Sequence, residues 1–151
     1  MSNEMQLKVF ASLLRRGRTL DIFSTGLTLL GVLLGLGQML MASPQLLLGT
    51  VASSLFIFGI AQKYYAVRVA FDADLFESIA QHPEQIPERT VALDAALMAL
   101  SMLPVDKVGR SWELRGQGAL KLLRLQLAYL CLQLLVTVGG LSLVLWLSFV
   151  R

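Results

Sequence analysis

Residues 22–61 contain no Lys, Arg, Asp, Glu or His, and this long uncharged stretch restricts the possible folds more than any other feature. It holds two apolar runs, residues 22–42 and 46–61, joined by a short connection. A helix needs roughly 20 predominantly apolar residues to cross a bilayer. The first run has that length, and the second reaches it if Lys63 and the two tyrosines after it lie at the headgroups. The stretch therefore predicts a transmembrane hairpin, with helices at residues 22–42 and 45–66.

A third uncharged run, residues 125–150, lies near the C-terminus and is longer than a minimum span, so it should tilt in the bilayer. The chain of 151 residues is 56% hydrophobic and only 15% charged, which is too apolar for an ordinary soluble domain. We therefore predict an all-α integral membrane protein with three transmembrane helices. The N-terminal hairpin would be followed by a cytoplasmic helical region, residues 67–124, and then by the C-terminal span.

The distribution of positive charge predicts how these helices cross the membrane. Of the 13 Lys and Arg residues, only Arg151 follows the third run, and none lies in the connection between the first two. Membrane proteins carry their excess of Lys and Arg on cytoplasmic flanks. The N-terminus and residues 67–124 are thus expected in the cytoplasm, and the C-terminus outside. The compact, Leu-rich chain favours the inner (plasma) membrane of a bacterium.

The N-terminal segment, residues 1–21, has the pattern of an amphipathic helix. Leu7 and Leu14 fall on an apolar side, and the basic residues fall on the other. Such a helix can lie in the membrane interface with its cations at the lipid headgroups, which is the interpretation we favour. The residues expected at the headgroups are Lys8, Arg15, Arg16 and Arg18. In the alternative, the apolar side packs on the protein's own cytoplasmic region.

Small residues in the first two spans indicate close helix packing. Gly31 and Gly35 form a GxxxG motif, which lets a second helix backbone approach closely. In the second span, Gly49 and Gly59 are the small residues that could pack against this motif. These glycines either pack the hairpin against itself or form a self-association face between copies, and both hypotheses stay open.

The region between the second and third spans is expected to be helical. No Gly or Pro interrupts residues 60–82, so the second helix should continue to about residue 81. A polar loop with two prolines then leads into a short helix, residues 90–103. This short helix cannot span a bilayer, so it is either cytoplasmic or re-entrant. It is apolar except for a thin polar edge formed by Thr90, Asp94 and Ser101.

The continued second helix carries apolar stripes on two sides, and one short helix cannot cover both. Large exposed apolar patches are rare in isolated proteins and usually mark interaction sites. A last helix should begin near Trp112, with Ser111 as its N-cap. The cytoplasmic contact with a partner or another copy is therefore predicted at Phe71, Leu75, Phe76 and Trp112.

Residues suited to catalysis or metal binding do not converge in the sequence. His82 is the only histidine, and its loop has no recognised ligand spacing. Asp72 and Asp74 would point about 200° apart on a helix, so they cannot share one ion. Cys131 is the only cysteine, and neither a nucleophile elbow nor a phosphate-binding loop is present. We expect no catalytic residues, no metal and no cofactor.

These features favour a non-enzymatic structural or accessory subunit of the membrane. Its partners would be membrane lipids and either further copies of the chain or a larger membrane complex. The net charge of +3 is explained by cytoplasmic flanks, so no nucleic acid is expected. The alternative is a small oligomeric pore lined by Gln38, Gln126 and Gln133, although glutamines in spans more often make interhelical hydrogen bonds.

Overall fold

The computed structural model describes residues 2–41, 43, 45–101, 104 and 108–150, and these residues form helices and connections without a strand. The predicted all-α class is therefore confirmed. The elements are α1 (Ser2–Arg15), α2 (Gly17–Met39), α3 (Leu46–Ala80), the short 3-10 helix η1 (Pro83–Gln85), α4 (Ile86–Ala99) and α5 (Trp112–Val150).

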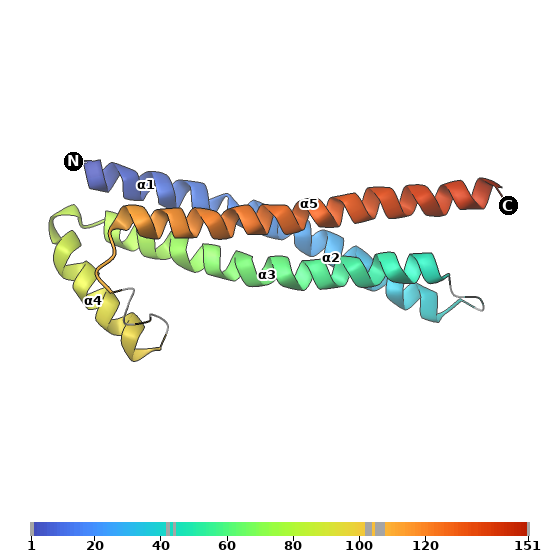
Figure 1. Cartoon of the computed structure of the whole chain (residues 1–151), viewed down its shortest axis with the longest axis horizontal. Helices are drawn as coiled ribbons and strands as arrows, with labels where there is room; N and C mark the ends of the chain where they lie inside the picture. Colours follow the sequence, from blue (N-terminus) through green and yellow to red (C-terminus); the bar gives the residue numbers. More distant parts are fainter. Residues whose placement is uncertain (1, 42, 44, 102–103, 105–107, 151) are drawn as a thin grey trace.

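The long helices lie side by side in an elongated bundle (Figure 1). The N-terminus and α4 are at one end, while the connection from α2 to α3 and the C-terminus are at the other. We call the first of these ends the α4 end. Arg16, between α1 and α2, keeps helical backbone angles (φ −63°, ψ −22°), so the two helices run on almost as one rod.

Three helical segments are long and apolar enough to cross a membrane, as the sequence predicts: Glu4–Met39, Leu46–Ala80 and Trp112–Val150. The expected continuation of the second helix is also confirmed, because α3 runs without interruption to Ala80. The last helix begins at Trp112 as predicted, and the Ser111 hydroxyl accepts a hydrogen bond from the Leu114 N–H. The helix predicted at residues 22–42 begins earlier, at Gly17, and ends at Met39.

Buried residues of the bundle recur every seven positions. This spacing keeps one stripe of each helix turned toward its neighbours, as in coiled coils, and the small side chains allow close approach. In α3, which lies between the other two rods, two such stripes are present. The series are Gly17, Ser24, Gly31 and Gln38 in α2; Ala52, Gly59, Ala66, Ala73 and Ala80 with Leu55, Gln62, Val69 and Phe76 in α3; and Ala119, Gln126 and Gln133 in α5.

The part of the apolar side of α1 that carries Leu7 and Leu14 is covered by protein, whereas Val9 is 50% exposed and Leu13 is 38% exposed. Leu7 and Leu14 are each 1% exposed and belong to the same core cluster as Val69 of α3 and Ala119 of α5. At Leu7 and Leu14 the helix packs on the chain's own α4 end, as in the second of the two arrangements considered for residues 1–21. The exposed Val9 and Leu13 stay available to the membrane interface.

An aromatic cluster closes the core at the α4 end. Phe76 packs against the ring of Phe10 at 5.6 Å between centroids and against that of Trp112 at 5.5 Å. Such tilted and edge-to-face contacts are favourable geometries for aromatic pairs. Gly116 of α5 provides the space for this cluster, because a Cβ there would lie 2.8 Å from Phe10 Cε1.

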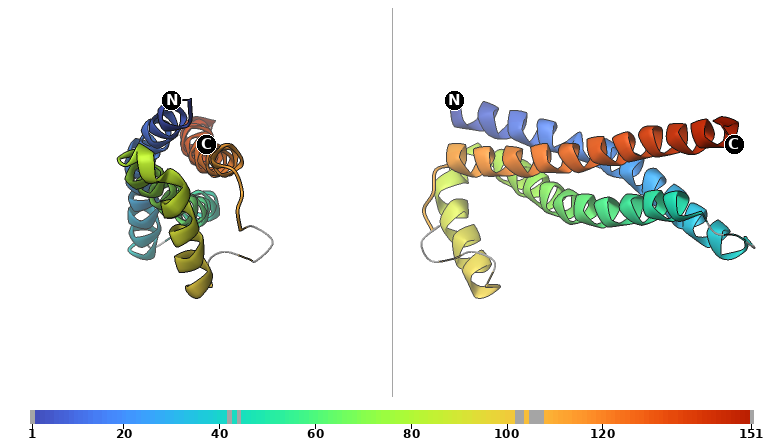
Figure 2. Two further views of the ribbon diagram at one scale, coloured as in Figure 1. Left: turned by 90° about the vertical axis from the view of Figure 1, so that its left-hand side faces the viewer. Right: turned by 45° about the vertical axis from the view of Figure 1, so that its right-hand side comes forward.

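The short helix α4 leaves the bundle at an angle, and its C-terminal end points away from the long helices (Figure 2). It begins at Ile86, four positions before the predicted start, because Pro87 in its first turn suits a helix N-terminus. It ends at Ala99, and residues 102–103 of the predicted helix lie outside the described part of the chain.

Candidate functional site

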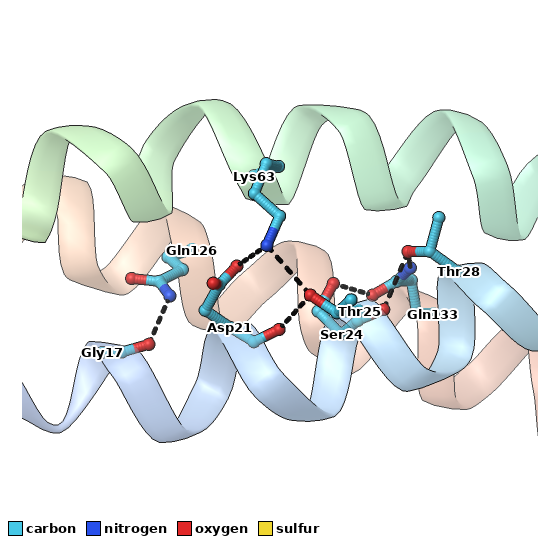
Figure 3. A network of polar contacts seen from close by, with 8 residues as sticks. All are labelled: Gly17, Asp21, Ser24, Thr25, Thr28, Lys63, Gln126 and Gln133. Atoms are coloured by element: carbon cyan, nitrogen blue, oxygen red, sulfur yellow. Dashed lines mark hydrogen bonds and ion pairs between the residues drawn. The ribbon is translucent and has the colours of Figure 1, made fainter.

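A row of polar side chains runs through the middle of the bundle (Figure 3). Gln133 of α5 is fully buried and joins all three rods. Its Oε1 accepts a hydrogen bond from the Ser24 hydroxyl at 2.5 Å. Its Nε2 donates to Thr28 Oγ1 at 3.1 Å and to the Leu55 backbone carbonyl at 3.0 Å. One side chain therefore ties α5 to both helices of the hairpin.

A second buried glutamine lies seven residues earlier, and within the described residues only its Nε2 is hydrogen-bonded. Gln126 Nε2 donates to the Gly17 carbonyl at 2.7 Å, at the start of α2. A Cβ at Gly17 would lie 2.9 Å from Gln126 Oε1, so the absence of a side chain makes room for the amide. The expectation that glutamines of the spans make interhelical hydrogen bonds is met at Gln126 and Gln133.

Gln62 of α3 differs from these two glutamines. It is fully buried, yet within the described part of the chain neither its Oε1 nor its Nε2 has a hydrogen-bond partner. Burying an amide without partners costs free energy. Gln62 therefore does not contribute to stability in the way that Gln133 does.

An ion pair lies beside the glutamines. Lys63 Nζ is 2.7 Å from Asp21 Oδ1 and donates a hydrogen bond to Thr25 Oγ1 at 2.9 Å (Figure 3). From the sequence, Lys63 is expected at the lipid headgroups, but its ammonium group turns to α2, where the Asp21 carboxylate is within reach. Neither residue was recognised as half of a pair, since 42 positions separate them in the sequence.

The three glutamines proposed as pore lining face the interior of their own chain. Gln126 and Gln133 are 0% exposed, and Gln38 is 8% exposed. Gln38 closes the turn of the hairpin, because its amide both donates to the Gln45 carbonyl and accepts from the Gln45 N–H. A lumen between copies would not meet these side chains in this arrangement.

The four glycines predicted at helix contacts have different surroundings. A Cβ at Gly31 would lie 2.8 Å from Leu55 Cβ, and one at Gly59 would lie 2.9 Å from Thr28 Cβ. These two glycines pack α2 against α3 within the chain. A Cβ at Gly35 would make an ordinary contact with Ala52 at 3.8 Å, and one at Gly49 would meet nothing within 4 Å.

A cleft of about 480 Å³ opens at the α4 end between α3, α4 and α5. All four residues predicted for the cytoplasmic contact line it, so the structure brings them together. Phe71 is 41% exposed, whereas Phe76 is 3% exposed and belongs to the core. Leu75 and Trp112 are half-buried, with exposures intermediate between those of Phe71 and Phe76. The lining also includes Val67, Arg68, Asp72, Leu93, Leu97, Arg110, Arg115 and Leu122.

Three polar contacts hold α4 in place over this cleft. Arg115 Nη2 pairs with Asp94 Oδ1 at 2.6 Å, and Asp94 Oδ2 accepts a hydrogen bond from the Gly109 N–H at 3.0 Å. Trp112 Nε1 donates to Thr90 Oγ1 at 2.9 Å. The thin polar edge of the predicted short helix is thus its contact with α5. Its polar character was the signal for such a partner, but the sequence did not identify Arg115.

The two carboxylates of this region have opposite environments. Burial acts to raise the pKa of Asp94, but hydrogen bonds from Gly109 and Arg115 and the charge of Arg115 outweigh it and lower the pKa. Asp72 lies outside the apolar segment that ends at residue 66. Burial raises the pKa of Asp72 to about 6, against the opposing charge of Arg68.

The basic residues expected at lipid headgroups lie along α1 and at the start of α2. Lys8 pairs with Glu4 in its own helix, and Arg15 pairs with Glu77 of α3. Arg16 and Arg18 are exposed.

Among the described residues, no three His, Cys, Asp or Glu side chains are grouped closely enough to hold a metal ion. No protein-family model, curated protein or solved structure matches the chain.

Proposed function

We propose that this chain is a non-enzymatic accessory subunit of a bacterial inner membrane. Its three long helices would cross the bilayer, with the α4 end in the cytoplasm and the C-terminus outside. The assignment of sides rests on Lys and Arg, all but one of which lie at or near the α4 end of the apolar runs. The subunit would assemble with further copies of itself or with another membrane protein.

This proposal rests on hydrophobic side chains that are exposed although they lie outside the three predicted transmembrane segments. Val91 of α4 is 71% exposed, Leu100 after α4 is 68% exposed and Val67 of α3 is 63% exposed. The outward-pointing α4 is separated from the apolar runs by a polar segment at both ends. Apolar surface of this kind usually marks an interaction site.

Glycines on the outer surface of the rods provide a second contact. A Cβ at Gly37 or at Gly49 would meet nothing within 4 Å. Small residues of this kind let another transmembrane helix approach closely. The outer surface of the hairpin is therefore suited to a membrane partner, in addition to the internal contact made by Gly31.

Serine substitutions on α4 test the assembly. The double variant Val91→Ser and Leu100→Ser removes the most exposed apolar side chains of this surface, and Met5→Ser with Val9→Ser on exposed positions of α1 is the matched control. After gentle detergent extraction, the wild type and the control should elute at a protein mass above the 16.6 kDa of one chain, or with a partner. The α4 variant should elute alone. A wild type that is a single 16.6 kDa chain without a partner would refute the proposal.

The second hypothesis remains an oligomeric pore. It requires a polar lumen between copies, whereas the glutamines that suggested it are buried within one chain. Ion conductance by the purified chain in liposomes would support the pore, and its loss in Gln133→Leu would assign the lining.

A further inference from the structure

We propose that the cleft between α3, α4 and α5 binds one acyl chain of an anionic lipid, whose phosphate pairs with Arg68 at the mouth. The lipid would come from the leaflet next to the α4 end. The proposal rests on the membrane placement given under the proposed function, but it does not need a protein partner.

The position of the cleft favours a lipid. Its lining begins at Val67, directly after the apolar segment that ends at residue 66, and at Leu122, just before the run that begins at residue 125. The apolar lining is thus continuous with the part of the rods that faces the bilayer. The cleft therefore adjoins the ends of the two apolar runs, where Lys63 and Arg68 of α3 and Lys121 and Arg124 of α5 also lie.

The lining is that of a site for an apolar ligand. Ligand sites are clefts of roughly 300–1,000 Å³ with mostly hydrophobic walls and a few polar groups, and this cleft has about 480 Å³. Its walls are formed by Phe71, Leu75, Leu93, Leu97, Trp112 and Leu122. The exposure of Phe71 leaves the apolar wall open on one side.

The charge at the mouth favours an anion. The Arg68 guanidinium lies 5.1 Å from the centre of the Tyr64 ring, at the level where tyrosines mark membrane interfaces. Among the described residues neither Arg68 nor Arg110 makes an ion pair within 4 Å, whereas Arg115 is engaged by Asp94. These two arginines outnumber Asp72, the one carboxylate in the lining. Arginine binds phosphate through two parallel hydrogen bonds, and basic pockets beside transmembrane helices bind anionic headgroups.

The size of the cleft argues against a partner helix as its occupant. A helix with its side chains is about 10–12 Å in diameter, so a volume of about 480 Å³ would hold only about one turn of it. A single acyl chain is much thinner and fills a narrow cleft along its length. Protein partners are therefore assigned to the outer surface of α4.

Fluorescence of Trp112 provides a direct test. The chain has two tryptophans, and Trp146→Phe leaves only the one in the cleft. Twelve helical residues lie between Trp112 and residue 125, where the third apolar run starts. The distance along the helix is about 20 Å, which is out of reach of bulk acyl chains. The variant is placed in phosphatidylcholine nanodiscs that contain either phosphatidylglycerol or phosphatidylcholine with brominated chains. Brominated phosphatidylglycerol should quench Trp112 with saturation at low mole fraction, and brominated phosphatidylcholine should not.

Two charge variants of equal size show where the phosphate binds. Arg68→Gln should raise the mole fraction of phosphatidylglycerol for half quenching by about tenfold, since one charge-assisted hydrogen-bonded pair is lost. Arg124→Gln removes the same charge nearby on α5 but does not line the cleft, and it should leave the titration unchanged. Arg68→Lys should recover part of the preference.

The other outcomes overturn the proposal. Equal quenching by brominated phosphatidylglycerol and brominated phosphatidylcholine shows that the cleft does not select the anionic headgroup. An equal loss of the preference for phosphatidylglycerol in Arg68→Gln and Arg124→Gln shows that the lipid is attracted by the general positive charge of the protein surface. Equal competition by soluble glycerol phosphate and by unbrominated phosphatidylglycerol shows that the phosphate alone carries the binding and the acyl chain adds nothing. Absence of quenching, including quenching blocked by a co-purifying protein in the cleft, excludes the acyl chain. If the chain fails to enter nanodiscs, the membrane placement itself is refuted. If a monomeric chain shows the specific quenching, the lipid proposal stands and only the proposed assembly is refuted.

Discussion

Lys63 of α3 and Asp21 of α2 form an ion pair, with Nζ 2.7 Å from Oδ1, beside a row of buried glutamines. Both residues stand at the edge of the uncharged stretch from which the fold is predicted. Their pairing fixes the α2–α3 register at the end of the hairpin that is remote from its turn. The turn itself is fixed by Gln38 and Gln45, so the hairpin is held at both ends.

Removal of one partner of this pair should destabilise the hairpin modestly. Lys63 is 47% exposed and Asp21 is 28% exposed, so screening limits the loss in Lys63→Gln to about 1 kcal/mol or less. The exchange Asp21→Lys with Lys63→Asp should recover part of it. Thermal unfolding in detergent measures both variants. If Lys63→Gln and the exchange have the same stability as wild type, the pair contributes nothing.

Alanine at the internal glycines should separate α2 from α3. A Cβ at Gly31 would lie 3.1 Å from the Ala52 carbonyl oxygen, which is backbone and cannot turn aside. Gly31→Ala should cost about 1–3 kcal/mol of unfolding free energy, as overpacking does. Gly26→Ala is the control, because an added Cβ there meets nothing within 4 Å. Equal stabilities of the two variants would place Gly31 away from a helix contact.

The buried glutamines should respond in opposite directions to leucine. Gln133→Leu leaves the Ser24 hydroxyl and the Leu55 carbonyl without their partner, which should cost about 1–3 kcal/mol. Gln62→Leu removes an amide that has no partner within the described residues, so stability should stay the same or increase. A loss at Gln62 as large as that at Gln133 would contradict this assignment.

The carboxyl group of Asp72 predicts an unusual pH dependence. Because burial raises its pKa from 3.8 to about 6, the folded chain binds this proton more tightly than the unfolded chain does. Its contribution to stability is therefore largest below pH 3.8 and declines as the pH rises to about 6. The difference in unfolding free energy between wild type and Asp72→Asn, measured across this range in detergent, should show the decline. A difference that does not vary with pH would refute the raised pKa.

Cysteine labelling tests the orientation of the helices. In a Cys131→Ser background, Ser43→Cys in the hairpin turn should react with a membrane-impermeant thiol reagent added outside intact cells. Glu84→Cys in η1 should react only after the cells are opened. Both positions are exposed, so burial does not explain a difference. Labelling of Glu84→Cys from outside would reverse or exclude the proposed topology.

Much of the helical framework could be predicted from the sequence. The length of α3 follows from a pattern without Gly or Pro that continues past the apolar run, and the start of α5 follows from Ser111 as a cap. These are local properties of the chain, which depend on neighbours three or four positions away. Phe71 and Leu75, predicted for the cytoplasmic contact, line one cleft for a related reason, because they share one side of a helix.

Whether protein or lipid contacts each apolar face of a helix could not be predicted in the same way. The pattern of α1 shows that Leu7 and Leu14 share a side, but lipid and protein satisfy that side equally well. The seven-residue spacing of Gly17, Ser24 and Gly31 could have indicated a continuous three-rod bundle. Phe76 was assigned to an outer surface because the sequence does not reveal that Phe10 and Trp112 enclose it.

Because α3 is uninterrupted, a small change in its tilt moves its far end by a large distance. Its 35 residues form a rod about 52 Å long that contains no proline and begins inside the proposed bilayer. The C-terminal part of α3, residues 67–76, forms one wall of the cleft. Tilting α3 by about ten degrees about its start would displace its far end by about 9 Å. A helix adjusts its tilt to the thickness of the surrounding bilayer, so the width of the cleft would follow the thickness of the membrane.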